Sequence, residues 1–266
     1  MIKMINNVIL GDGITGYVIA ACLNYNNEDF KIYGNGKYSP PAILLLKYKS
    51  QYELLEYFNI FEIPYSAENI DKYTKAIRVG YTNDFKTILD KPTPEMKRNY
   101  LEKQNREATP SAMSDDLTTF YGIDLKLVYE HLKKKYKKHF VLCDVKKENF
   151  KSLVGCTIYN TIFPTEFNNN EPSIEYVSVD KTNLKGYNYI YDCNKNSRIK
   201  RITPECVEYI SSPGHYDFTI KNYYDAPRIY TITNPKTQCT WVDIGRNATR
   251  TQTKQEDIIK YIVKYE

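Results

Sequence analysis

The sequence predicts an α/β protein that carries a second, antiparallel β region, and three observations lead to this prediction. A β-α-β pattern opens the chain, with strands over Asn7–Leu10 and Phe30–Tyr33 and a helix over Tyr17–Tyr25 between them. Residues 173–233 then alternate apolar and polar positions in several short runs, as strands of antiparallel sheets do. Near the end, "TWVDIGR" (240–246) is typical of one more strand that runs into a glycine.

The composition is that of a globular protein that handles anionic ligands. The chain has 266 residues, of which 42% are hydrophobic and 26% charged, and its formal net charge is +5. The six cysteines and three histidines form no CxxC pair and no metal spacing, so we expect no metal site. No apolar run approaches the ~20 residues of a membrane span. We therefore expect a cytoplasmic protein with reduced thiols and no membrane partner.

The middle of the chain combines apolar runs with one polar segment. Residues 90–118 are rich in Pro, Lys, Glu, Asn and Ser without periodicity, so we expect an excursion over 90–119 that caps the core or is mobile. The other expected elements are a helix over Ala42–Leu46, a helix over Tyr52–Phe58, short strands between Ile77 and Leu89, a strand over Thr157–Phe163 and a final helix over Asp257–Lys264 behind a Thr253/Glu256 capping box.

A further helix is expected from Asp124, and it has two different faces. One is apolar and the other is lysine-rich, which is typical of a helix lying on a core. A solvated surface is one interpretation of the lysines, and a contact to nucleic acid or nucleotide is the other. The apolar face comprises Leu125, Val128, Tyr129, Leu132 and Tyr136, and the basic face comprises Lys133, Lys134, Lys135, Lys137 and Lys138.

Three of the 11 glycines lie in "GDGITG", directly after the first strand. Gly11 permits a tight turn, Gly13 lets the backbone approach a pyrophosphate, and Gly16 lets the helix pack close to the sheet. The phosphate then meets the N–H groups of the first helical turn, which include Ile14 and Thr15. The sequence therefore predicts a Rossmann-like FAD/NAD(P)-binding fold. The alternative is a turn kept for packing in a protein without a cofactor.

One feature of the usual pattern is absent. The acidic residue that holds the adenosine ribose hydroxyls should follow the second strand, near Tyr33. The sequence there is "KIYGNG", which contains no Asp or Glu. Ribose recognition is therefore expected from Asn35, from a backbone group, or from elsewhere.

At these motifs the chain resembles flavoproteins of the glutathione-reductase-like superfamily, most closely the UDP-galactopyranose mutase and amine-oxidase branch. "VILGDGITGYVIAACL" is similar to their FAD fingerprint, and "CTIYNTIFP" to the strand that returns to the FAD domain. "YNYIYDCNKNSRIKRIT" resembles the mutase stretch whose arginine, here Arg198, faces substrate or flavin. "IYTITNP" resembles the tyrosine-bearing substrate strand, with Tyr230. The chain is shorter than the mutases, which implies a trimmed substrate region.

The resemblance extends to the end of the chain. "VDIGRNATRTQTKQEDIIKYI" is similar to a C-terminal element whose Gly-Arg pair, here Gly245 and Arg246, abuts the flavin. A glycine lets the backbone approach the flavin, and a guanidinium can bind phosphate or a reduced, anionic flavin. "YGIDLKLVYEHL" and "FVLCDV" also look like elements of halogenase-like and hydroxylase-like flavoproteins.

Together these patterns predict the domain organisation and a function. Residues 1–89, 120–170 and 234–266 are expected to form a discontinuous FAD-binding domain, and 171–233 an antiparallel-sheet substrate domain. The expected activity is that of an FAD-dependent oxidoreductase or flavin-dependent isomerase. Its expected substrate is anionic, such as a nucleotide, nucleotide sugar or modified nucleic-acid base. The alternative is a non-catalytic dinucleotide- or nucleic-acid-binding protein, and the oligomeric state stays open.

Overall fold

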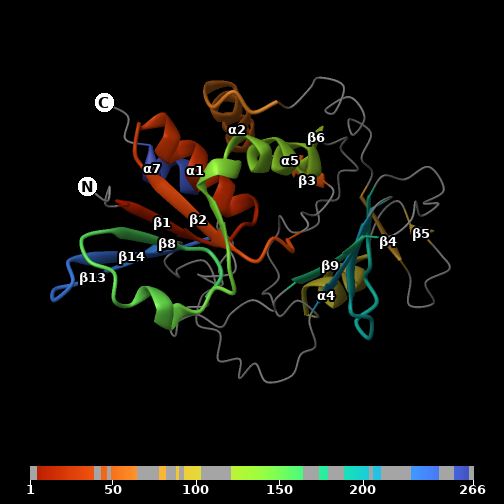
Figure 1. The fold of residues 1–266 in the computed structure, drawn as a ribbon. Coiled ribbons are helices and arrows are strands. Elements are labelled where there is room, and N and C mark those ends of the chain that lie inside the picture. Colours follow the sequence, from red (N-terminus) through yellow and green to blue (C-terminus); the bar gives the residue numbers. More distant parts are fainter. Residues whose placement is uncertain are drawn as a thin grey trace.

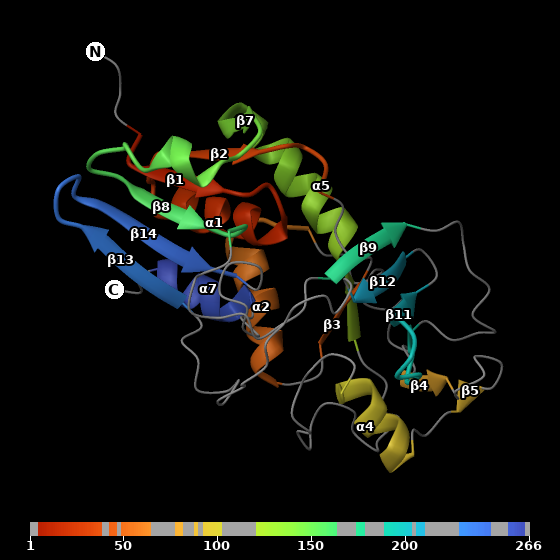
Figure 2. The same ribbon diagram turned by 90° about the horizontal axis from the view of Figure 1, so that it is seen from below.

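A computed structural model shows two six-stranded sheets, each with its own helices (Figure 1). The first sheet carries the helices α1, α2, α5 and α7, and the second lies beside α4 (Figure 2). The structure describes residues 5–38, 43–46, 49–64, 78–81, 88–89, 93–102, 121–163, 174–178, 189–203, 206–210, 229–245 and 255–263.

The first sheet is parallel except for one edge strand, which confirms the predicted α/β class. Its strand order is β13-β14-β8-β1-β2-β7, and only β13 runs antiparallel, against β14. The strands are β1 (Asn7–Leu10), β2 (Phe30–Gly34), β7 (Phe140–Leu142), β8 (Thr157–Asn160), β13 (Ile229–Asn234) and β14 (Cys239–Ile244).

Both faces of this sheet are covered. Ile9 of β1 packs into a cluster with the helices, whereas its neighbours Val8 and Leu10 pack into a second cluster with Phe150. The helices on the first face are α1 (Ile14–Tyr25), α2 (Lys49–Ile60), α5 (Leu125–Lys135) and α7 (Gln255–Ile262), and the 3₁₀ helix η2 (Lys147–Phe150) lies on the other. A strand that is buried on both faces has a continuous apolar sequence, as β1 does with "VIL".

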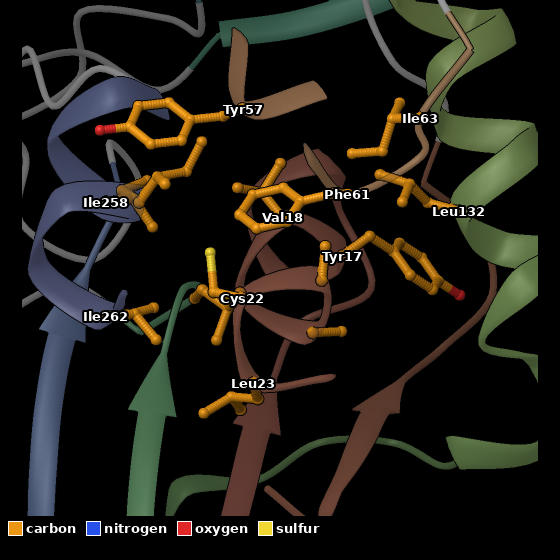
Figure 3. Packing of buried hydrophobic residues seen from close by; sticks show 14 of the residues in the cluster. Tyr17, Val18, Cys22, Leu23, Tyr57, Phe61, Ile63, Leu132, Ile258 and Ile262 are labelled. Carbon is orange, nitrogen blue, oxygen red and sulfur yellow. The ribbon is translucent and has the colours of Figure 1, made fainter. Parts of the chain in front are cut away.

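Helix α1 is the centre of the larger cluster. Every residue from Gly16 to Leu23 is buried, because α1 lies between the sheet and the other helices. Figure 3 shows Val18 and Cys22 of α1 among side chains of α2, α5 and α7, including Tyr57, Leu132 and Ile258. Elements from both ends of the chain therefore share one core.

Helix α5 confirms the predicted apolar stripe, since all five of its members are buried. The basic face has partners inside the molecule. Lys135 Nζ donates to Phe61 O (2.9 Å) just beyond the end of α2 and lies 3.5 Å from the Glu62 carboxylate. Lys31 Nζ donates to Lys138 O (3.3 Å), which holds the end of this segment to β2. Part of the lysine-rich region therefore stabilises the fold.

The second sheet differs from the predicted division of the chain in two places. Its order is β5-β4-β10-β11-β12-β9, so of the strands between Ile77 and Leu89, β4 pairs with β10 and β5 pairs with β4, and neither joins the glycine-turn sheet. Conversely, β13 lies within the predicted substrate range but pairs with β14. The second-sheet strands are β4 (Arg78–Tyr81), β5 (Ile88–Leu89), β9 (Ile174–Ser178), β10 (Tyr189–Tyr191), β11 (Ile199–Thr203) and β12 (Cys206–Ile210).

The predicted excursion over 90–119 contains a helix that the sequence analysis did not predict. Helix α4 (Pro94–Glu102) begins after Thr93, whose Oγ1 accepts a hydrogen bond from Met96 N (3.2 Å). Threonine as N-cap followed by proline at the first helical position is a common start signal. The buried Tyr100 of α4 packs edge-on against Tyr191 of β10, with ring centroids 5.0 Å apart. Residues 103–120 lie outside the described residues.

The expectation of a helix over Ala42–Leu46 is wrong, because the described residues 43–46 form a strand. The structure has strand β3 (Ile43–Leu46), which pairs antiparallel with β6 (Tyr121–Asp124). An apolar run this short has no periodicity that separates helix from strand, so a partner 75 residues or more away decides between them.

The close packing of α1 on the sheet leads to a stability prediction. A Cβ at Gly16 would overlap with the carbonyl oxygen of Gly11, which belongs to the backbone and cannot move aside cheaply. We expect Gly16→Ala to lower the free energy of unfolding by about 1–3 kcal/mol, as overpacking does. Urea unfolding measures this. Asn24→Ala, at an exposed position of the same helix, should leave stability unchanged or raise it. Equal effects of the two variants would contradict the prediction.

Candidate functional site

The three glycines of the predicted turn connect β1 to α1. Gly11 has a φ of +114°, a conformation that favours glycine, and its N–H donates to Tyr33 O (2.8 Å) on β2. A Cβ at Gly11 would overlap with Thr161 Oγ1 at the end of β8. The turn is therefore packed against the ends of both strands that flank β1.

Helix α1 presents the N–H groups of its first turn beside these glycines. Gly13 is the N-cap, and its carbonyl accepts the first helical hydrogen bond, from Tyr17 N (3.1 Å). The N–H groups of Ile14, Thr15 and Gly16 have no acceptor within the helix, and Gly13 has no side chain to cap them. With the positive end of the helix dipole, such groups form an arrangement suited to a phosphate.

The turn lies at the point where the strand order of the first sheet reverses. From β1 the chain continues to β2 on one side, and β8 on the other side is added later. Ligands of open α/β sheets bind outside the carboxyl ends of the strands at such a point. Thr161 fixes the two ends together here, because its N–H (3.0 Å) and its Oγ1 (2.8 Å) both donate to Leu10 O.

The structure brings the C-terminal glycine to the same place. Gly245 follows β14 with a φ of +90°, and a Cβ there would lie 2.8 Å from Thr15 Cγ2. From α7, Gln255 Nε2 donates to Thr15 Oγ1 (3.2 Å). Gly245 therefore lies against the first turn of α1, and its expected contact with the flavin stays a prediction. Arg246 lies outside the described residues, so its role stays a prediction.

A buried polar network joins β8 and β14 at their carboxyl ends. Asp243 Oδ1 accepts hydrogen bonds from Asn160 Nδ2 (2.5 Å) and from Trp241 Nε1 (2.8 Å). Asn160 Oδ1 in turn accepts from the N–H groups of Ile162 (3.2 Å) and Phe163 (2.9 Å). This turn ends β8 at Asn160, three residues before the predicted end. The network places a buried carboxylate at the edge of the sheet that carries the glycine turn.

Asp12 is a candidate site residue that sequence reasoning missed. Its side chain is only 6% exposed, and its Oδ2 accepts a hydrogen bond from Gly36 N (2.8 Å) in the turn after β2. The signal in the sequence was an acid inside the glycine turn, together with a glycine, Gly34, at the end of the second strand. Either observation alone carries little information.

Two buried tyrosine hydroxyls lie near Asp12. Burial, with a smaller contribution from the Asp12 carboxylate, raises the pKa of Tyr129 to about 12. Burial also raises the pKa of Tyr17, with smaller contributions from Tyr129 and Asp12. Neither hydroxyl has a hydrogen-bond partner among the residues that the structure describes. A buried hydroxyl without a partner costs free energy, and such groups concentrate beside binding sites.

The two residues expected near the ribose have local contacts. The Tyr33 carbonyl accepts the hydrogen bond from Gly11, while its ring packs edge-on against Phe150, with ring centroids 5.1 Å apart. Burial raises the pKa of Tyr33. Asn35 is exposed, and its Oδ1 accepts a hydrogen bond from Lys37 N (2.9 Å) in its own turn. A role of Asn35 in binding ribose stays a prediction.

The two candidate catalytic residues belong to different sheets. Arg198 is exposed and lies just before β11 in the second sheet. Tyr230 lies on β13 in register with Asp243, so its backbone position is at the carboxyl edge of the first sheet. The structure therefore brings Tyr230, and not Arg198, to the sheet edge that carries the glycine turn. Their catalytic roles stay predictions.

Two kinds of feature are not found in the part of the chain that the structure describes. None of its helices is long and apolar enough to cross a membrane. Within the same ranges, no three or more His, Cys, Asp or Glu side chains are grouped as ligands for a metal ion.

Comparisons with known proteins give only distant similarities. No protein-family profile and no curated protein matches the chain. A putrescine oxidase variant redesigned for cofactor binding shares a TM-score of 0.39 at 9% identity, over 78% of this chain and 75% of that chain. Klebsiella pneumoniae HpxO complexed with FAD and uric acid has a TM-score of 0.39 at 10% sequence identity, over 77% of this chain and 55% of that chain. The p-nitrophenol 4-monooxygenase PnpA from Pseudomonas putida has a TM-score of 0.40 at 9% sequence identity, over 80% of this chain and 59% of that chain.

The chain spans little more than half the length of HpxO and PnpA. With TM-scores below 0.5, these similarities carry no weight for the cofactor or the reaction of this chain. Both have to follow from its own residues.

The buried Tyr129 leads to a prediction about alkaline pH. Because its pKa is raised to about 12 in the folded protein, the unfolded chain loses this proton first as the pH rises past the ordinary value of about 10. The free energy of unfolding should therefore fall less steeply between these pH values for Tyr129→Phe than for the wild type. Urea unfolding at neutral pH and in this window measures the slopes. Tyr25→Phe, at an exposed ring, is the control and should keep the wild-type slope.

Proposed function

We propose that this chain is an FAD-dependent oxidoreductase whose cofactor lies with its pyrophosphate over residues 11–16. The observation that supports this most is the position of the glycine turn, at the carboxyl end of β1 where the strand order reverses. Three elements that are distant in sequence converge there, because Thr161 and Gly245 both pack against the turn and its helix. A turn kept only for packing would not need the uncapped first turn of α1 as well.

The residues present fit an anionic dinucleotide. Ile14, Thr15 and Gly16 offer backbone N–H groups to the phosphates, and Gly13 leaves room for their approach. This room is bounded by the ring of Tyr38, which lies 3.3 Å from the place that a Cβ on Gly13 would take. Gly245 supplies a second backbone segment beside Thr15, which suits a cofactor longer than a mononucleotide.

FAD, when bound, supplies the ability to accept and return electrons, and the chain supplies position and electrostatics. In this proposal Arg246, directly after Gly245, binds phosphate or the flavin with its guanidinium. Tyr230 at the edge of the first sheet and Arg198 contact an anionic substrate. The formal net charge of +5 supports a nucleotide, nucleotide sugar or modified base as that substrate.

Two finer readings remain within this proposal. The resemblance to UDP-galactopyranose mutase would make the reaction an isomerisation. A net redox reaction instead needs a substrate that is oxidised by FAD and an acceptor that takes the electrons from the reduced FAD. Non-catalytic binding of nucleic acid through α5 is supported less, because the Lys135 side chain already has partners within the fold and Lys133 Nζ lies over the ring of Tyr129. Oligonucleotide binding that weakens steeply with salt would raise this alternative.

The first test of the proposal is binding of FAD by the wild type and by Gly13→Val. We expect the wild type to bind FAD but not FMN, because the site is built for the pyrophosphate of a dinucleotide. Gly13→Val should lose FAD, because its side chain would occupy the approach to the phosphates. Quenching of flavin fluorescence on titration measures both. Thr233→Val on the exposed edge strand β13 is the matched control and should bind as the wild type does.

A second variant separates two causes of this loss, since the new valine would also displace Tyr38. Gly13→Val/Tyr38→Ala removes the ring. If phosphate exclusion is the cause, the double variant stays unable to bind FAD. Recovery of full affinity in the double variant would show that Gly13 serves only to admit Tyr38.

A separate prediction concerns the C-terminal Gly-Arg pair. Arg246→Ala should weaken FAD binding by roughly 1.5–3 kcal/mol, the usual loss for one charge-assisted hydrogen bond. Thermal stability without FAD should barely change, because the guanidinium is proposed to bind the cofactor. The comparison is with Arg250→Ala, four residues further on and expected to be solvated. Equal and negligible effects of the two variants on FAD affinity would contradict the proposed contact between Arg246 and FAD.

A further inference from the structure

The carboxylate that a dinucleotide site needs is present, but it comes from a different place in the chain. In this type of fold an Asp or Glu follows the second strand and accepts hydrogen bonds from the ribose hydroxyls. Here β2 ends at Gly34, which has no side chain. Asn35, the next polar residue, is exposed and bonds within its own turn.

Asp12 fills the space that an acidic side chain at position 34 would occupy. A Cβ built on Gly34 would overlap with the carboxyl carbon of Asp12 and would lie 2.5 Å from both its Cβ and its Oδ1. The latter separation is about the span from Cβ to a carboxylate oxygen within one aspartate. An Asp at position 34 could therefore place an oxygen close to the place where Asp12 Oδ1 now lies.

The two oxygens of Asp12 have different surroundings. Oδ2 accepts the hydrogen bond from Gly36 N (2.8 Å), which fixes the carboxylate against the turn after β2. Oδ1 has no hydrogen-bond donor among the described residues. Asp12 as a whole is only 6% exposed, but Oδ1 is not among the fully buried polar atoms without a partner, so a ligand can reach this oxygen. A ligand hydroxyl that donates to Oδ1 would complete a strong, charge-assisted hydrogen bond.

We propose that Asp12 is the ribose-binding acid of this protein and that its Oδ1 accepts a hydrogen bond from the 2′-hydroxyl of the adenosine half. The inference rests on the proposed dinucleotide site. It assigns the site a specificity: a ribose diol is bound, whereas a 2′-phosphate is repelled by the buried negative charge. Gly34 is then required because any side chain there would displace the carboxylate.

A purely structural role for Asp12 predicts something different. Its hydrogen bond to Gly36 ties the glycine turn to the end of β2, and its charge lies near the N-terminus of α1. Loss of such a role would disturb the whole site and weaken every adenine nucleotide alike. Loss of a ribose-binding role, in contrast, would weaken the binding only of ligands that carry the 2′-hydroxyl.

The test compares ADP with 2′-deoxy-ADP by calorimetry, in the wild type and in Asp12→Asn. We expect the wild type to bind ADP about 10- to 100-fold more tightly than 2′-deoxy-ADP. Asp12→Asn keeps an acceptor for Gly36 N, so the fold should be retained, which its urea unfolding midpoint checks. Asp12→Asn should lose affinity for ADP by a similar factor and for 2′-deoxy-ADP hardly at all.

A transplant of the carboxylate makes the test sharper. Asp12→Gly removes the acid, and Gly34→Asp alone creates the overlap, so each single variant should lose the preference for ADP. The double variant Asp12→Gly/Gly34→Asp places the acid after β2 without the overlap and should restore the preference. Restoration is a result that a merely structural Asp12 would not give.

Three outcomes would overturn the inference, and they separate it from the proposed function. In the first, the wild type binds FAD, but it binds ADP no more tightly than 2′-deoxy-ADP. This result would contradict ribose recognition by Asp12 and would still support the FAD site. An equal loss for both nucleotides in Asp12→Asn gives Asp12 a structural role only. Failure of the wild type to bind FAD and ADP at all overturns the dinucleotide site and this inference with it.

Discussion

The close approach of α1 to β1 is the constraint on which the rest of the structure depends. The helix starts so near the strand that the carbonyl of Gly11 occupies the space of a side chain at position 16. From there α1 runs buried on all sides, with the sheet below it and α2, α5 and α7 packed around it. Because interiors are packed to near-crystalline density, a shift of this helix would open gaps against four other elements at once. The site and the core are therefore set by the same contact.

This contact also explains why residues of the proposed cofactor site are found at both ends of the chain. The strand order places β8 and β14 on the side of β1 away from β2, so their carboxyl ends point at the glycine turn. Thr161 and Gly245 then meet the turn and the start of α1 so closely that a Cβ on Gly11 would overlap with Thr161 and a Cβ on Gly245 would crowd Thr15. Asn160 and Asp243 hold these two strand ends to each other by a buried hydrogen bond. Residues that are far apart in sequence become neighbours because the sheet is parallel.

The sequence predicted the part of the fold in which local patterns and packing agree. The β-α-β unit, the apolar stripe of α5 and the strand that ends at Gly245 were all visible as periodicity or as glycine placement. The errors arose where a distant partner decides. Ile43–Leu46 became a strand because β6 pairs with it, and β13 joined the first sheet although its alternation matches that of the second. Helix α4 was missed because its Thr-Pro start signal lies in a polar segment.

Asp12 and Gly34 illustrate why site residues are harder to predict than strands. A motif assigns a function to a position in the sequence, but a ligand requires only that an oxygen lies at a position in space. Where two strands run parallel, their carboxyl ends lie side by side, as the hydrogen bond from Gly11, after β1, to Tyr33, near the end of β2, shows. Residues that follow the two strands can then reach the same point. An acid can then move from one loop to the other if the vacated position becomes glycine. The absence of an acid after β2 is thus compatible with a dinucleotide site, because the same register that pairs β1 with β2 lets Asp12 take its place.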